Sequence, residues 1–94
     1  MKLIFCIACE DVVRLDPDMD RTCKCGKSGG RYVDGRNAEV WGKDCIPLGI
    51  VSHSLANAIK FRSPDAGLGE HFDACVIPVE CPTIKVIEAP DGGA

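Results

Sequence analysis

Four cysteines near the start of the chain restrict its fold more than any other feature. Cys6 and Cys9 form a Cys-x-x-Cys pair, and Cys23 and Cys25 form a second pair after thirteen intervening residues. Each pair can present two thiolates on one tight turn, and two such turns on a hairpin complete a tetrahedron around Zn²⁺. The spacing therefore predicts one structural zinc ion. A site of four thiolates leaves no open position for a water nucleophile, so we do not expect it to be catalytic.

The length of 94 residues predicts a single domain over 1–94. We divide it into a zinc ribbon and hairpin over 1–43, a helix with two closing strands over 44–88, and a tail over 89–94. A chain this short buries a small core, so a metal bound with about 10–16 kcal/mol can decide whether it folds. The hydrophobic fraction of 46% is typical of a folded domain.

The cysteine usage and the hydropathy pattern indicate a cytoplasmic protein. The seven cysteines are an odd number and include two close pairs, which suits a metal site in a reducing compartment better than a disulfide framework. The apolar run over 3–7 is shorter than the core of a secretory signal. No apolar stretch approaches the roughly 20 residues that span a bilayer, so no membrane association is expected.

The charges of the chain are unevenly distributed. The net charge is −3, yet residues 21–36 contain five basic side chains and one acidic side chain. The overall acidity argues against broad coating of nucleic acid, which draws on dense positive charge. The local basic segment still permits phosphate contacts. It equally fits a role in offsetting the charge of four metal-bound thiolates, and the pattern does not separate these two roles.

The first half of the chain is rich in strand and turn signals. Strands are expected over 2–7 and 11–15, and the Asp-rich, Pro-containing segment 16–20 is typical of a turn before the second cysteine pair. The Asp34-Gly35 pair between β-rich segments predicts a hairpin.

The second half predicts one helix and two further strands. The helix begins after Ser52 as N-cap, has Leu55, Ala58 and Ile59 on one face, and ends before Ser63-Pro64. A mobile glycine-rich loop is expected over 66–69, and strands are expected over 72–79 and 83–87. The predicted class is α+β, in which an N-terminal zinc ribbon continues into an antiparallel sheet with the helix packed across it.

The predicted hairpin offers a surface for a partner. Tyr32 and Trp41 lie on its opposite arms, with Arg31 and Arg36 nearby, and Trp, Tyr and Arg dominate interface hot spots. Trp41 fits a core position equally well, because the chain has only five aromatic residues. The candidate partner-binding residues are Arg21, Lys24, Lys27, Arg31, Tyr32, Arg36 and Trp41.

The remaining cysteines and histidines leave open whether the chain has a second metal site. His71, Cys75 and Cys81 could supply three ligands of a second metal site, with Cys45 or His53 as the fourth, or could be buried or surface side chains. No catalytic constellation is recognisable. Ser52-His53-Ser54 lacks an orienting carboxylate, and Cys6-x-x-Cys9 follows a strand rather than opening a helix as a redox pair does. We therefore expect no enzyme activity.

At the two cysteine pairs and over Ser28 to Tyr32, the chain resembles a zinc ribbon, rubredoxin-like in the broad sense, across residues 1–43. The whole chain is loosely similar to small uncharacterised phage and bacterial proteins that join a ribbon to a short α+β segment. This resemblance implies a rigid platform that binds protein or nucleic acid, often within transcription, replication or translation machinery. The leading hypothesis is a non-enzymatic protein that binds and modulates a larger macromolecular machine. The alternative is a nucleic-acid-binding ribbon that contacts phosphates through residues 21–36.

Overall fold

The computed structural model describes residues 1–64, 67, 69–78 and 80–90. Within these residues the chain forms eight strands and one helix, which confirms the α+β class. The elements are β1 (Lys2–Cys6), β2 (Val12–Arg14), β3 (Arg21–Thr22), β4 (Gly29–Tyr32), β5 (Ala38–Trp41), β6 (Cys45–Ile50), α1 (Ser52–Lys60), β7 (Ala74–Val76) and β8 (Ile84–Val86).

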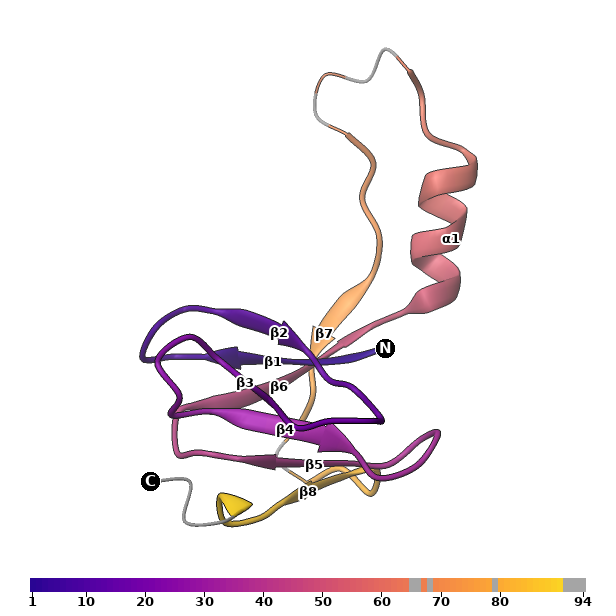
Figure 1. Cartoon of the computed structure of the whole chain (residues 1–94). Coiled ribbons are helices and arrows are strands. Elements are labelled where there is room, and N and C mark those ends of the chain that lie inside the picture. Colours follow the sequence, from indigo (N-terminus) through magenta and orange to yellow (C-terminus); the bar gives the residue numbers. More distant parts are fainter. Residues whose placement is uncertain (65–66, 68, 79, 91–94) are drawn as a thin grey trace.

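The strands form two sheets, shown in Figure 1, rather than the single sheet expected. Sheet 1 has the order β2-β1-β6-β7, and sheet 2 has the order β3-β4-β5-β8. All pairs are antiparallel except β5 and β8, which are parallel, so the expectation of a purely antiparallel sheet is wrong. Between β5 and β8 the chain passes through β6, α1 and β7. Because a connection of this length is not a tight hairpin, β8 can pair with β5 in the parallel direction.

The hydrophobic core lies between the two sheets. Ile4 and Val13 face each other across β1 and β2 and are buried, and Val40 and Ile84 contribute from sheet 2 to the same cluster. Because side chains alternate along a strand, the even-numbered residues of β1 point to this core and its odd-numbered residues point away. Both sheets therefore have an inner face and an outer face.

The outer faces of the two sheets differ in chemistry. On sheet 2 the outer face includes Arg31 and Glu39, which form an ion pair. On sheet 1 the strand register places almost only apolar side chains on the outer face, and the large ones of β1 and β6 are half-buried. We call this surface the outer face of sheet 1; Arg14 is its one charged member, and the others are Leu3, Phe5, Val12, Ile46, Leu48, Ile50, Ala74 and Val76.

Strand β6 was not indicated by the sequence pattern, although it pairs with both β1 and β7 in the middle of sheet 1. Its sequence contains Pro47 and Gly49, two residues that argue against a central strand. Pro47 lies opposite Ile4 of β1, and its carbonyl oxygen accepts a hydrogen bond from the Ile77 N–H at 2.9 Å, so it still takes part in the pairing on both sides of β6.

The helix α1 is present, but two details of its prediction are wrong. It does not pack across a sheet: none of its residues is buried, and Figure 1 shows it standing away from both sheets beyond the end of β6. Its N-cap is Val51, which has no capping side chain, and Ser52 is the first helical residue. The reason is the chain path, since β6 ends at Ile50 and a single extended residue leads into the helix.

Both predicted turns are confirmed by hydrogen bonds of aspartate side chains. Asp16 Oδ1 accepts the Asp18 N–H at 2.8 Å, and Asp34 Oδ1 accepts the N–H groups of Arg36 and Asn37, both at 2.8 Å. The Asn37 side chain, which donates to Asp34 Oδ2, and these two backbone bonds lower the pKa of Asp34 to about 2. The hairpin β4–β5 is thus closed by residues 33–37.

The closing strands follow the prediction where the structure describes them. β7 and β8 lie within the expected segments 72–79 and 83–87. The expected loop over 66–69 and the tail over 89–94 fall partly outside the described residues. Of the described residues, no helix is long and apolar enough to cross a membrane.

Candidate metal centre

The first cysteine pair lies at the turn between β1 and β2. Cys6 is the last residue of β1, and its N–H donates to the Asp11 carbonyl at 3.0 Å. The chain reverses over residues 7–10, where the Glu10 N–H donates to the Cys6 carbonyl at 2.7 Å. Glu10 adopts φ of 60°, the left-handed conformation that such a tight reversal needs. This turn directs Cys9 back toward Cys6.

The second cysteine pair lies at the turn between β3 and β4, in sheet 2. The Cys23 N–H donates to the Ser28 carbonyl at 3.0 Å, and the Gly26 N–H donates to the Cys23 carbonyl at 3.0 Å. Gly26 has φ of 79°, so a left-handed residue follows the second cysteine of this pair as it does in the first pair. The Lys24 N–H donates to Asp11 Oδ2 at 2.9 Å, which ties the two turns together.

The four sulfur atoms form one compact group. All four Sγ atoms lie within 4.8 Å of one another, with Cys6 and Cys25 3.8 Å apart and Cys23 and Cys25 3.5 Å apart. A zinc tetrathiolate with bonds of about 2.3 Å has sulfur–sulfur edges of roughly 3.8 Å. The structure therefore brings together all four predicted ligands at distances that could hold a metal ion, including those of the unusually tight Cys-x-Cys pair.

The close approach of the four sulfur atoms shifts the pKa values of the cysteine thiols in this group. Burial raises the pKa of Cys23, but hydrogen bonds from the Ser28 N–H and from the three neighbouring thiols outweigh burial and lower it to about 6. At Cys25 the Lys27 N–H lowers the pKa, while burial and the other thiols raise it to about 12 overall. One thiolate is thus stabilised by its neighbours, and full deprotonation calls for a cation.

Ser28 is a buried polar residue beside this group. Among the described residues, its Oγ is the one buried side-chain nitrogen or oxygen without a hydrogen-bond partner. The hydroxyl group is nevertheless the largest influence on Cys6, whose pKa it lowers, while burial raises it. By geometry the contact falls short of a hydrogen bond, and a metal-bound Cys6 thiolate would supply the acceptor that the hydroxyl lacks. This fit favours a metal at the site.

We expect Ser28→Ala to weaken metal binding without disrupting the fold. The substitution removes the hydroxyl that can donate to Cys6 and leaves no unpaired buried oxygen behind. Loss of such an outer-shell donor typically reduces metal affinity about 10–100-fold. Competition with a chromophoric chelator measures the change. An affinity equal to that of the unmodified chain would show that Ser28 is a packing residue only.

Among the described residues, the other cysteines and histidines are not brought together into a second group of possible metal ligands. Of the residues that the structure describes, Cys6, Cys9, Cys23 and Cys25 are the one group of three or more metal-binding side chains that come together. Cys75 is exposed on β7, and Cys45 donates a weak 3.8 Å hydrogen bond to the Gly29 carbonyl. The open alternative of a site at His71, Cys75 and Cys81 therefore finds no support in the structure.

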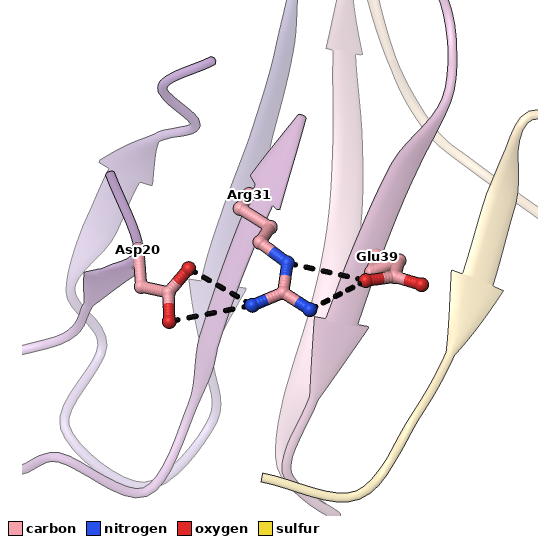
Figure 2. A network of polar contacts seen from close by, with 3 residues as sticks. All are labelled: Asp20, Arg31 and Glu39. Atoms are coloured by element: carbon pink, nitrogen blue, oxygen red, sulfur yellow. Dashed lines mark hydrogen bonds and ion pairs between the residues drawn. The ribbon is translucent and has the colours of Figure 1, made fainter. Parts of the chain in front are cut away.

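Three of the seven candidate partner-binding residues make internal contacts. Figure 2 shows Arg31 between Glu39 at 2.8 Å and Asp20 at 3.2 Å, and its guanidinium group also lies 5.8 Å from the centre of the Trp41 ring. Trp41 is only 4% exposed, and the Tyr32 hydroxyl accepts the Lys2 N–H at 2.7 Å. These side chains therefore stabilise the fold.

The other four candidates, Arg21, Lys24, Lys27 and Arg36, are exposed. The first three surround the second cysteine pair and form no ion pair within the described part of the chain. A cleft of about 740 Å³ opens beside Lys27, and its lining also includes Lys43, Asp20 and Asp44. Cys25, the exposed ligand, also lines this cleft. We call Arg21, Lys24, Lys27 and Lys43 the knuckle face.

Some contributors to the site could not be recognised from the sequence. Asp11, which ties the two turns together, looked like an ordinary strand residue, and Ser28 lay in a glycine-rich segment without a distinct signal. Lys43 joins the knuckle face only because β5 runs beside β4 and brings the end of the hairpin back to the cysteines.

Comparison of the chain with protein-family models, curated proteins and solved structures finds no match. The class of the protein is therefore defined by its own fold and site. It is a small α+β protein of two four-stranded sheets, with a group of four cysteines that can hold a metal ion.

Proposed function

We propose that this protein is a non-enzymatic, cytoplasmic interaction module of the zinc-ribbon type, which binds a larger macromolecular assembly. One structural Zn²⁺ is held by Cys6, Cys9, Cys23 and Cys25. The observation that carries the proposal is the placement of four sulfur atoms within 4.8 Å of one another on two turns from different sheets. Such a site fixes the two turns as a rigid platform.

The donor set favours zinc over other ions. Four thiolates in a compact group suit Zn²⁺ or an iron–sulfur centre, whereas Mg²⁺ and Ca²⁺ prefer oxygen ligands. The sulfur–sulfur distances of 3.5 and 3.8 Å match a single central ion. Since four protein ligands complete its tetrahedron and leave no open position, the ion would stabilise the fold and would not take part in catalysis. The seven cysteines, all of which the structure describes, form no disulfide with one another, which suits a reducing compartment.

The knuckle face is the surface that we assign to the partner. Its lysines and arginine are exposed and form no ion pair within the described residues, and two of them, Lys27 and Lys43, line a cleft of about 740 Å³ together with Asp20 and Asp44. We infer that it docks on an acidic region of a protein, because the chain as a whole carries a net charge of −3 and its remaining surface would repel a polyanion. Trp41 also lines this cleft, and the Arg31 guanidinium lies over its ring.

Nucleic acid is the second candidate partner. The unpaired Arg21, Lys24 and Lys27 on one side of the metal group are the observation that favours it. Phosphate contacts by such residues would make binding fall steeply with salt.

Substitution of Lys24 and Lys27 by Gln tests the surface and separates the two candidates. A control that changes Lys60 and Lys85 to Gln removes the same charge from exposed positions elsewhere. We expect the first variant, and not the control, to lose a protein captured by the tagged chain from its own cells, while zinc content stays unchanged. A gel shift with DNA or RNA at low salt, weakened by the first variant and by added salt, would favour nucleic acid. Equal capture by both variants would contradict the assigned surface.

A further inference from the structure

Cys45 lies directly opposite one of the four clustered cysteines in the strand pairing of sheet 1. Cys6 is the last residue of β1, and Cys45 is the first residue of β6 and its register partner. Residues directly opposite each other on neighbouring strands point to the same face of a sheet. Cys6 is completely buried on the inner face, and Cys45 packs against the same core cluster. A fifth thiol therefore lies next to the group of four.

The hydrogen-bond pattern brings the two backbones close together at this cross-strand pair. In an antiparallel ladder, hydrogen-bonded and non-hydrogen-bonded pairs of residues alternate. The Ile7 N–H donates to the Asp44 carbonyl at 2.9 Å, so the adjacent pair, Cys6 and Cys45, is a non-hydrogen-bonded one. The Cα atoms of such a pair lie about 4.5 Å apart. Disulfides span Cα separations of about 4.4–6.8 Å, so the strand register allows one here.

The two thiols have different neighbours in the structure. Cys6 Sγ lies 3.8 Å from Cys25 Sγ, whereas Cys45 Sγ donates its weak hydrogen bond to the Gly29 carbonyl. Because the two backbones are already paired, a change of side-chain rotamer is the movement that would bring the two sulfurs together. A metal ligand must be a thiolate, so a disulfide between Cys6 and Cys45 would remove Cys6 from the metal group.

We propose that Cys6 and Cys45 form a reversible disulfide when the protein meets a peroxide, and that this disulfide lowers the affinity of the metal group by withdrawing one ligand. The disulfide rests on the strand register, and its effect on zinc rests on the proposed function. The expected Cα separation is at the short end of the usual range, and strained disulfides are easier to reduce than relaxed ones. Transient, redox-sensing disulfides of this kind are the ones found in a reducing compartment.

The oxidation begins at Cys25, the exposed ligand beside the cleft. Its thiolate, the form that a metal group requires, attacks one oxygen of hydrogen peroxide; the O–O bond breaks, hydroxide leaves, and Cys25 becomes a sulfenic acid. The Cys6 thiolate, whose sulfur is 3.8 Å away, attacks the Cys25 sulfur, and the S–O bond breaks with loss of a second hydroxide.

Cys45 completes the reaction as the resolving cysteine. It gives its proton to one hydroxide and attacks the Cys6 sulfur, so that the Cys6–Cys45 bond forms and Cys25 leaves as a thiolate. The other hydroxide takes a proton from the solvent. Two cysteine sulfurs are thus oxidised, and one peroxide is reduced to two water molecules.

Peptide mapping of the zinc-loaded chain after peroxide treatment tests the disulfide. We expect tryptic peptides 3–14 and 44–60 to be joined, with fragment ions that assign the bond to Cys6 rather than to Cys9. A zinc indicator should detect release of the bound ion, and reduction with dithiothreitol should restore both the free thiols and zinc binding.

Two serine variants supply the matched comparison. Cys45→Ser should bind zinc before oxidation as the unmodified chain does, and should yield no joined peptides. Cys81→Ser is the control, because Cys81 is also half-buried and packs against the same core cluster. It should form the Cys6–Cys45 disulfide to the same extent as the unmodified chain.

The outcomes separate this inference from the proposed function. If the purified chain held no zinc, the zinc site would be wrong, while a Cys6–Cys45 peptide from that chain would still support the disulfide. A zinc-binding chain that gave no disulfide, or only disulfides within the group of four, would overturn the inference. Full retention of zinc by the chain that contains the Cys6–Cys45 bond would overturn it as well.

Discussion

Chelation of the metal is expected to unfold the chain and to release one zinc ion per molecule. A structural zinc contributes about 10–16 kcal/mol of apparent binding energy, and small domains have total stabilities of about 5–15 kcal/mol. The four cysteines come from β1 and its turn in sheet 1 and from the β3–β4 turn in sheet 2, so an ion held by them would join both sheets. Loss of circular dichroism on addition of a chelator, with the released metal measured by a zinc indicator, checks this result.

Single substitutions at the cysteines supply the matched control. Cys9→Ser and Cys25→Ser should leave the chain largely unfolded, while Cys75→Ser should not. Cys25 and Cys75 are both exposed, so the contrast between them reports metal binding rather than loss of a buried side chain. Unchanged circular dichroism and melting temperature in either ligand variant would contradict the metal site. A stoichiometry near two ions per chain would bring His71, Cys75 and Cys81 back as ligands.

The second large effect is expected at Gly42, which follows β5 next to the second cysteine pair. Gly42 has φ of 107°, a conformation that side chains rarely adopt, and a Cβ there would overlap the Lys27 carbonyl oxygen. Backbone strain and steric overlap each cost about 1–3 kcal/mol. We therefore expect Gly42→Ala to lower the melting temperature by at least roughly 8 °C, because the combined cost of about 2 kcal/mol or more corresponds to about 4–8 °C per kcal/mol in a domain of this size. Thermal unfolding of the zinc-loaded protein measures it.

Substitutions at two other glycines separate the two causes of the lowered melting temperature, which are backbone strain and steric overlap. Gly35 has open space around its Cα and no positive φ, so Gly35→Ala should leave the melting temperature nearly unchanged. Gly26 has φ of 79° but also has open space, so Gly26→Ala should show the cost of conformation alone. If Gly42→Ala were no worse than Gly26→Ala, the overlap with Lys27 would be relieved by a small shift of the backbone.

The metal group and the hairpins could be predicted because their signals are local. Cys6 and Cys9 lie within one turn, Asp34 closes its hairpin through neighbouring N–H groups, and the aspartates of 16–20 act on their own backbone. Each of these structures is determined by residues a few positions apart, so a single stretch of sequence contains the cause.

The parts that were predicted wrongly depend on contacts between distant segments. β6 is a central strand because β1 and β7 pair with it on both sides, and this pairing overrides the unfavourable Pro47 and Gly49. The helix was recognised from its apolar spacing, but its position follows from the single residue Val51 that precedes it. Arg31 looked available to a partner because Asp20 and Glu39, its ion-pair partners, belong to other strands or turns.

The order of the metal ligands along the chain has a consequence for synthesis in the cell. All four precede residue 26, whereas β6, α1, β7 and β8 follow residue 44. A nascent polypeptide can therefore capture its cation while most of the protein is still unmade, and the short loop between the ligands costs little entropy to close. Supply of the ion during synthesis would then decide whether the first two turns are joined before the later strands and the helix are made.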